Sequence, residues 1–254
     1  MESFTLTRIE MSHLLLSMTG KLDQKPLPIL QEAWTKYHQE EMKKGTTLPA
    51  FLSTDIPVII QKIIKGRAPK GLSLGEIAAL GHLIEYSTLS ATAMQNWVKR
   101  DFKEYLGSPR EGKKYSLNQA ALLFIIDDLK ATLDFESIRQ LFRLLFLKPE
   151  SDDDDLLEPA QLYHAYAVLF ETIKANPLLY NHGMQDRNEL GERSWKDCVM
   201  KASTEGMMKR WAQLSKTQYS AVWNTIYIAA ISAQTCYYQS LARQSFNAAL
   251  FLDF

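Results

Sequence analysis

Strong helix-start signals restrict the fold of this sequence. Among these signals are the capping boxes Ser73–Glu76 and Ser116–Gln119, and each one places a Ser three residues before a Glu or Gln. In a capping box the two side chains bond to each other's free backbone N–H groups, so a helix starts there. Strand signals are nearly absent, since the best short apolar run, residues 56–64, has as much helical as β character. The sequence therefore predicts a mainly α fold.

A change in composition indicates how the chain is divided. The chain has 254 residues, which is long enough for more than one folding unit. Six acidic residues fall between Glu150 and Glu158, flanked by Pro149 and Pro159, a pattern typical of a solvated linker. The predicted units are a helical N-terminal extension at 1–70, a central unit at 71–147, an acidic linker at 148–159 and a helical C-terminal domain at 160–254.

Apolar residues at helical spacing predict further helices outside the central unit. We expect them at 7–18, 28–43, 160–176, 189–214 and 218–250. The last helix has no charged residue from Thr217 to Ala242, which raises the alternative of membrane attachment. Its Gln and Asn residues make a poor lipid-facing helix, so we expect a buried helix or a dimer interface instead.

Motifs for catalysis or metal binding are missing. The five histidines are scattered without metal-ligand spacing, and the sequence has no P-loop and no dinucleotide-binding motif. The two cysteines, Cys198 and Cys236, form no CxxC pair and fit a reducing compartment. We therefore expect a cytoplasmic protein that is not an enzyme, with no catalytic residues, no metal and no cofactor.

Charge is unevenly distributed although the formal net charge is zero. Residues 61–115 contain ten cations and five acids, a net charge of +5. Residues 116–160 contain four cations and ten acids, a net charge of −6. A basic block of this kind is where contacts with nucleic-acid phosphates would be made.

The segment from Ser90 to Lys103 is predicted to be the second helix of a helix-turn-helix. Met94, Trp97 and Val98 share one face and should pack on the preceding helix. The opposite face carries two amides and two cations, Gln95, Asn96, Lys99 and Arg100. Such side chains can bond to base edges or phosphates, but they also suit a solvated surface, and this helix alone does not decide between the two.

The residues around this helix resemble a known family. The order "SATAMQNWVKR", then "GKKYS", then the apolar helix "LNQAALLFIIDDL" resembles the winged helix-turn-helix of MerR-type transcription regulators. It is more similar still to an uncharacterised bacterial family, the domain of unknown function 1836. The resemblance covers residues 72–147. Where MerR proteins have Arg-Tyr-Tyr, this chain has Gln95-Asn96-Trp97, so the contacts of that aromatic pair are not carried over.

The resemblance implies a DNA-binding bacterial transcription regulator with a MerR-like winged helix-turn-helix domain. The residues expected to contact DNA lie on the second helix and in the wing: Gln95, Asn96, Lys99, Arg100, Lys103, Arg110, Lys113 and Lys114. The C-terminal helices would form a homodimer or bind a small-molecule or protein effector. The alternative is a protein–protein interaction module, in which the basic block binds an acidic partner or this chain's own Asp152–Asp155 run.

Overall fold

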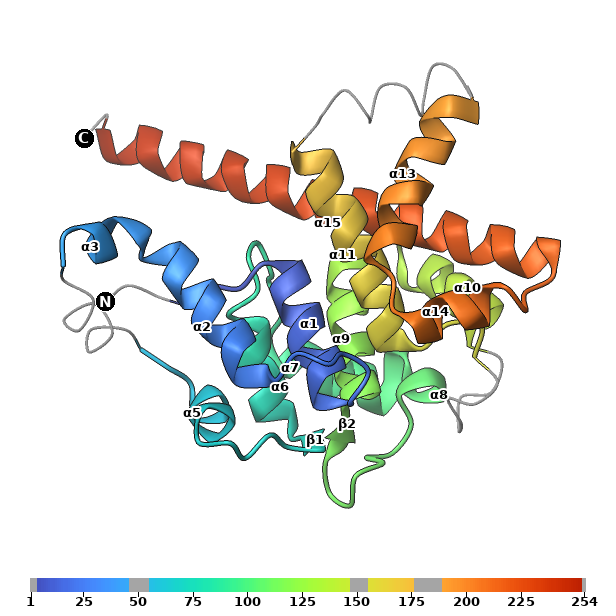
Figure 1. The fold of residues 1–254 in the computed structure, drawn as a ribbon, viewed down its shortest axis with the longest axis horizontal. Coiled ribbons are helices and arrows are strands. Elements are labelled where there is room, and N and C mark those ends of the chain that lie inside the picture. The colour runs from blue at the N-terminus through green and yellow to red at the C-terminus, as the bar shows by residue number, and fades with distance from the viewer. Residues whose placement is uncertain (1–3, 46–54, 147–154, 176–188, 253–254) are drawn as a thin grey trace.

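The computed structural model is mainly helical and describes residues 4–45, 55–146, 155–175 and 189–252. Figure 1 shows the arrangement of its elements. The helices are α1 (Arg8–Met18), α2 (Pro26–Tyr37), α3 (Gln39–Lys43), α5 (Val58–Ile64), α6 (Leu74–Gly81), α7 (Ala91–Asn96), η1 (Trp97–Asp101), α8 (Lys103–Leu106), α9 (Leu117–Leu129), α10 (Phe135–Leu145), α11 (Pro159–Ala175), α13 (Glu189–Ala202), α14 (Glu205–Trp211) and α15 (Lys216–Leu252). Two short strands, β1 (Gly71–Leu72) and β2 (Tyr115–Ser116), pair antiparallel.

The helix starts follow the local signals in the sequence. Both predicted capping boxes are formed, at Ser73 before α6 and at Ser116 before α9. The ambiguous run at 56–64 forms a helix, α5, and not a strand. The helix predicted at 189–214 is two helices, because Thr204 accepts a hydrogen bond from the Met207 N–H and starts α14.

The core is built around α9 and α11. Helix α11 packs against α1, α9, α13 and α15, and α9 also contacts α15 and α1. One cluster of buried apolar side chains extends from Phe4 to Ala233 and includes residues of the N-terminal, central and C-terminal units. The predicted boundaries between these units therefore remain predictions, and the units share one core in this structure.

The acidic segment only partly fits the prediction of a solvated linker. Residues 148–154, with most of the acidic run, lie outside the described part of the chain. Residues 155–159 follow the core surface: Leu156 and Leu157 are buried, and the Leu156 N–H donates to the Leu145 carbonyl at 2.9 Å. Two leucines in succession supply the apolar area that holds this end of the segment to the core.

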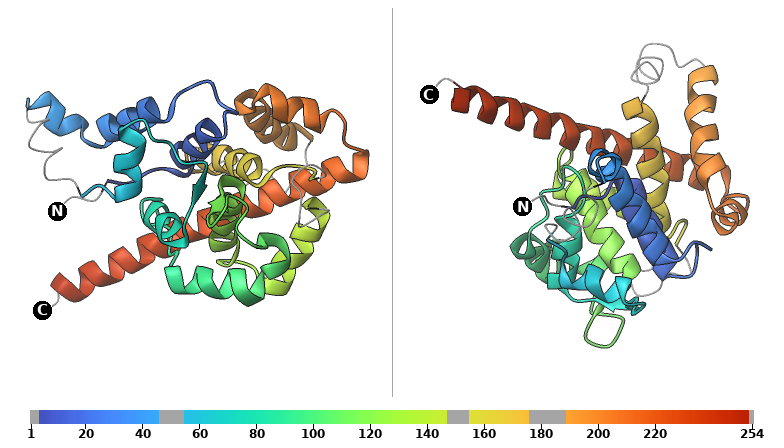
Figure 2. Two further views of the ribbon diagram at one scale, coloured as in Figure 1. Left: turned by 90° about the horizontal axis from the view of Figure 1, so that it is seen from below. Right: turned by 60° about the vertical axis from the view of Figure 1, so that its left-hand side comes forward.

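Helix α15 is the longest element. Its first part is packed on α9, α10 and α11, with Val222, Ile226 and Ala233 buried. Its last part extends away from the body, as Figures 1 and 2 show. None of the helices within the described ranges combines the length and the apolar character needed to cross a membrane.

Candidate nucleic-acid interface

Helices α6 and α7 pack against each other and occupy the two segments predicted to form a helix-turn-helix. The first helix of the pair is short and ends at Gly81. The chain turns over residues 82–90, where Tyr86 takes a left-handed conformation with φ of 64°. Gly81 allows this turn to close, because a Cβ there would lie 2.6 Å from the Leu89 side chain. Ser90 then caps α7 by accepting from the Ala93 N–H at 3.2 Å.

The second helix contains a π-helical turn, η1, that the sequence did not reveal. The Phe102 N–H donates to the Trp97 carbonyl five residues earlier, at 2.9 Å. On a regular α-helix these two positions would point in directions about 140° apart. The wider π turn brings both rings to the core side, where Trp97 and Phe102 are buried with their ring centroids 6.5 Å apart.

The two faces predicted for this helix are confirmed by burial. Met94, Trp97 and Val98 are buried. Gln95, Asn96, Lys99 and Arg100 are exposed, and so is Lys103 at the start of α8. The helical period was enough to separate these faces, although Val98, Lys99 and Arg100 lie within the π turn.

A β-hairpin follows the second helix, in the position expected for a wing. Glu111 and Lys114 pair across its tip through backbone hydrogen bonds of 2.9 and 3.1 Å, and Gly112 has a positive φ of 67°. The loop between α8 and β2 projects from the body in Figure 1. Lys113 is exposed at this tip, whereas Arg110 is half-buried.

Glu76 ties the hairpin to the rest of the molecule. Its carboxylate binds Lys114 at 3.0 Å and Lys62 of α5 at 2.8 Å, while it also caps α6. Partial burial acts to raise the pKa of Glu76, but hydrogen bonds from Lys62, the Ser73 N–H and Lys114 outweigh it and lower this pKa to about 2. Lys114 therefore holds the hairpin in place, which differs from the free phosphate contact predicted for it.

Arg100 also has an acidic neighbour. Its guanidinium lies 2.7 Å from Asp101, and this contact raises the pKa of Arg100. Arg100 is fully exposed, so the pair is screened by water and can exchange for a phosphate at little cost. Lys99, Lys103 and Lys113 are exposed as well, so four cations of η1, α8 and the hairpin are open to solvent.

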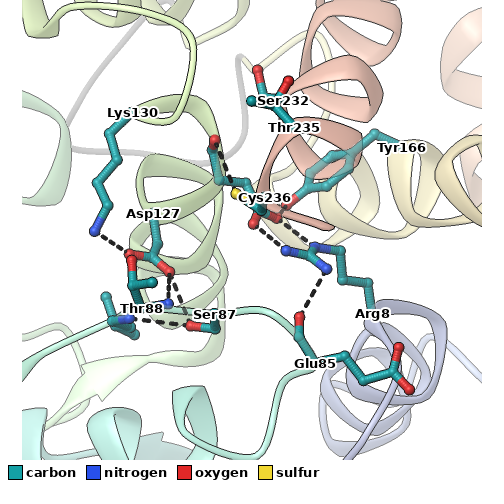
Figure 3. Close-up of polar contacts among 12 residues, drawn as sticks. Arg8, Glu85, Ser87, Thr88, Asp127, Lys130, Tyr166, Ser232, Thr235 and Cys236 are labelled. Carbon is teal, nitrogen blue, oxygen red and sulfur yellow. Dashed lines mark hydrogen bonds and ion pairs between the residues drawn. The ribbon is translucent and has the colours of Figure 1, made fainter. Parts of the chain in front are cut away.

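A buried aspartate, Asp127 of α9, fixes the turn before the second helix (Figure 3). Its Oδ2 accepts hydrogen bonds from the Ser87 hydroxyl at 2.9 Å and the Thr88 N–H at 3.2 Å. Its Oδ1 pairs with Lys130 at 2.5 Å, and the Lys130 ammonium lies 5.3 Å from the centroid of the Trp97 ring. Asp127 thus holds the turn before the second helix, and Lys130, at the end of α9, contacts the π turn through Trp97.

The next residue, Asp128, connects α9 to the first and last thirds of the chain. Arg8 donates to both of its carboxylate oxygens, at 2.6 and 2.9 Å, and also to the Glu85 carbonyl at 3.0 Å. The Tyr166 hydroxyl donates to Asp128 at 2.7 Å, and Cys236 lies against its backbone carbonyl. The signal for this network in the sequence is the pair of acids, Asp127 and Asp128, inside the apolar run "LLFIIDDL".

These features define a class of protein: a mainly helical chain in which a capped helix pair and a short hairpin are held on a buried central helix. Comparison with known proteins gives the family. The chain belongs to the family of the domain of unknown function (DUF1836), whose model matches residues 75–166. It is 32% identical over 244 residues to the uncharacterized protein YkrK of Bacillus subtilis (strain 168), which covers 96% of this chain and 97% of the relative. No solved structure matches the chain.

The predicted relation to the DUF1836 family is thereby confirmed. The finer resemblance to MerR-type regulators remains a prediction.

Proposed function

We propose that this protein is a DNA-binding transcription regulator that uses a MerR-like winged helix-turn-helix. One observation carries the proposal: the second helix of a helix-turn-helix exposes Gln95, Asn96, Lys99 and Arg100 while its opposite face is buried. A helix placed in this way can enter the major groove of DNA with its polar face toward the bases. The exposed Lys113 in the projecting hairpin supports the proposal, because a wing binds the adjacent backbone.

The exposed residues have separate proposed roles. Gln95 and Asn96 read base edges, since an amide can bond twice to adenine. Lys99, Arg100, Lys103 and Lys113 bind phosphates and supply most of the affinity. Arg110 and Lys114 contribute less than the sequence predicted, because Arg110 is half-buried and Lys114 is paired with Glu76.

The first test measures the affinity for genomic DNA fragments over a range of salt concentrations. Replacing Lys99, Arg100 and Lys113 with Ala should lower the affinity at least tenfold and reduce the slope of log K against log salt by about 0.9 for each lost phosphate contact. The matched control replaces three exposed cations elsewhere, Lys25, Lys44 and Lys209, with Ala and should bind as the unchanged protein does. Equal binding by both variants would contradict the proposal.

A second test separates a DNA reader from the protein-interaction alternative. Selection from a random DNA pool should enrich a defined sequence, and the double change Gln95→Ala and Asn96→Ala should alter that sequence while the salt slope stays the same. A pool without any enriched sequence would favour the interaction module.

The proposal includes a homodimer formed through the projecting end of α15. This end exposes a group of large apolar side chains: Tyr238, Leu241, Phe246, Leu250, Phe251 and Leu252. Arg243 is the one charged residue between positions 217 and 252, so two copies can pair along this helix with little repulsion between like charges. A homodimer would bring two recognition helices to related half-sites. An effector site in the C-terminal helices and a location in the cytoplasm remain predictions.

A further inference from the structure

A cavity of about 500 Å³ lies between α2 and α5, away from the candidate nucleic-acid interface. Its walls are formed mainly by apolar side chains, among them Phe4, Leu30, Trp34 and Ile60. A volume of this size falls in the range of small-molecule sites. Water inside an apolar cavity is unfavourable, so a ligand that displaces it gains free energy.

The polar groups of the cavity limit the class of ligand. Gln31 and Thr35 are the polar side chains on its walls, and they lie one helical turn apart on α2, on the same side of that helix. None of the described wall residues is ionisable. A carboxylate or an ammonium group would therefore find no ionic partner among these residues, whereas a hydroxyl or an amide could bond to both side chains.

We propose that this cavity binds an uncharged amphipathic small molecule, with an aliphatic chain in the apolar part and one hydroxyl or amide head between Gln31 and Thr35. The amide of Gln31 and the hydroxyl of Thr35 can each donate and accept a hydrogen bond, as such a head requires. The site is distinct from the candidate nucleic-acid interface, because it shares no residue with the exposed face of the second helix.

Calorimetric titration of the full-length protein with two probes of equal chain length tests the class of ligand. We expect 1-decanol to bind with one molecule per chain, and decanoate to bind at least tenfold more weakly. The absence of decanol binding would overturn the proposal. This holds also if a second copy of the chain, or another part of the same chain, fills the cavity and excludes the probe. Equal affinity for decanol and decanoate would overturn it too.

Two variants on α5 test the position of the site. Ile64 lines the cavity and is partly exposed, so the change Ile64→Trp fills the cavity from its edge and should weaken decanol binding at least tenfold. The matched control is Val58→Trp, at an exposed position of the same helix that does not line the cavity, and it should leave binding unchanged. Equal decanol affinity in the two variants would contradict this location.

The head group is tested with the double change Gln31→Leu and Thr35→Val, which keeps the approximate shape of both side chains. Both positions are exposed enough for the fold to tolerate the change. Loss of two hydrogen bonds should weaken decanol binding about tenfold. Unchanged affinity would overturn the proposed orientation, and this test decides the matter if Ile64→Trp does not fold.

Discussion

At the scale of single residues, Arg8 and Asp128 form a buried ion pair in which each charge needs its partner. Arg8 is fully buried, and burial acts against its charged form, but the Asp128 carboxylate outweighs this and raises the pKa of Arg8. Replacing Arg8 with Met leaves a buried carboxylate without its cation, which should cost about 3–5 kcal/mol of unfolding free energy. Urea denaturation measures the change, and Arg243→Met on the exposed end of α15 serves as control. Equal midpoints in the two variants would exclude the role given to this pair.

Gly81 shows how one missing side chain permits the turn before the second helix. A Cβ at this position would lie 2.6 Å from Leu89 Cδ2 and 3.2 Å from Leu89 Cβ. We expect Gly81→Ala to destabilise the protein by about 1–3 kcal/mol, because Leu89 is buried and has to move. Gly75→Ala in the same helix meets no atom closer than 4.0 Å and should be neutral or slightly stabilising. Thermal unfolding of the two variants checks this difference.

Residues whose placement depends on local periodicity could be predicted from the sequence. The exposed positions of Gln95 and Asn96 followed from the helical repeat, and burial confirms them. The role of Asp127 could not be predicted in this way, because its partners Ser87 and Thr88 lie about forty residues earlier in the chain. The signal in the sequence was only that two acids interrupt an apolar helix, a pattern that requires buried partners.

At the scale of elements, Glu76 joins α5, α6 and the hairpin, and its titration should be visible in stability. The pKa of this carboxyl is about 2 in the folded protein and 4.5 in its ordinary state. As the pH falls, the unfolded chain takes up the proton first, so the stabilisation is complete above about pH 4.5 and is lost between about 4.5 and 2.

We therefore expect the unchanged protein to be more stable than Glu76→Gln at pH 7, and the difference in unfolding free energy to shrink toward zero as the pH approaches 2. Denaturation at a series of pH values measures this difference. Glu104→Gln, at an exposed position of α8, is the control and should show no such trend. A difference that stays constant with pH would contradict the role of the ionised Glu76.

Element boundaries set by local hydrogen bonds were predictable, whereas those set by packing were not. The boxes at Ser73 and Ser116 involve residues three apart, and both are formed. The π turn in the second helix depends on Phe102 reaching the rings of Phe135 and Phe142, both of α10. Such a contact across the molecule leaves no local pattern in the sequence.

At the scale of the whole molecule, the projecting end of α15 makes a prediction about assembly. We expect sedimentation to give twice the chain mass of 29.1 kDa for the unchanged protein. Leu241 and Leu252 lie three turns apart on one side of the helix, and changing both to Glu should give the mass of a single chain. Gln239→Glu, at an exposed position on the opposite side of the helix from these two leucines, should remain a dimer. A single-chain mass for the unchanged protein would remove the homodimer from the proposed function.

The long-range arrangement could not be read from the sequence. The composition change near residue 150 predicted separate units, yet α1 and α15 both pack on the helices that follow and precede it. The amphipathic pattern shows that a helix has a buried face, but it does not show which other helix covers that face.

The ion pair of Arg8 has a practical consequence for anyone who wishes to isolate the part of the chain that defines the family. A fragment limited to residues 75–166 retains Asp128 but lacks both Arg8 and the segment of α15 around Cys236. In such a fragment α9 would expose apolar surface on two sides, and Asp128 would have lost its cation. The family segment is thus not transplantable: grafted into another protein, it would need a substitute for each end of this chain.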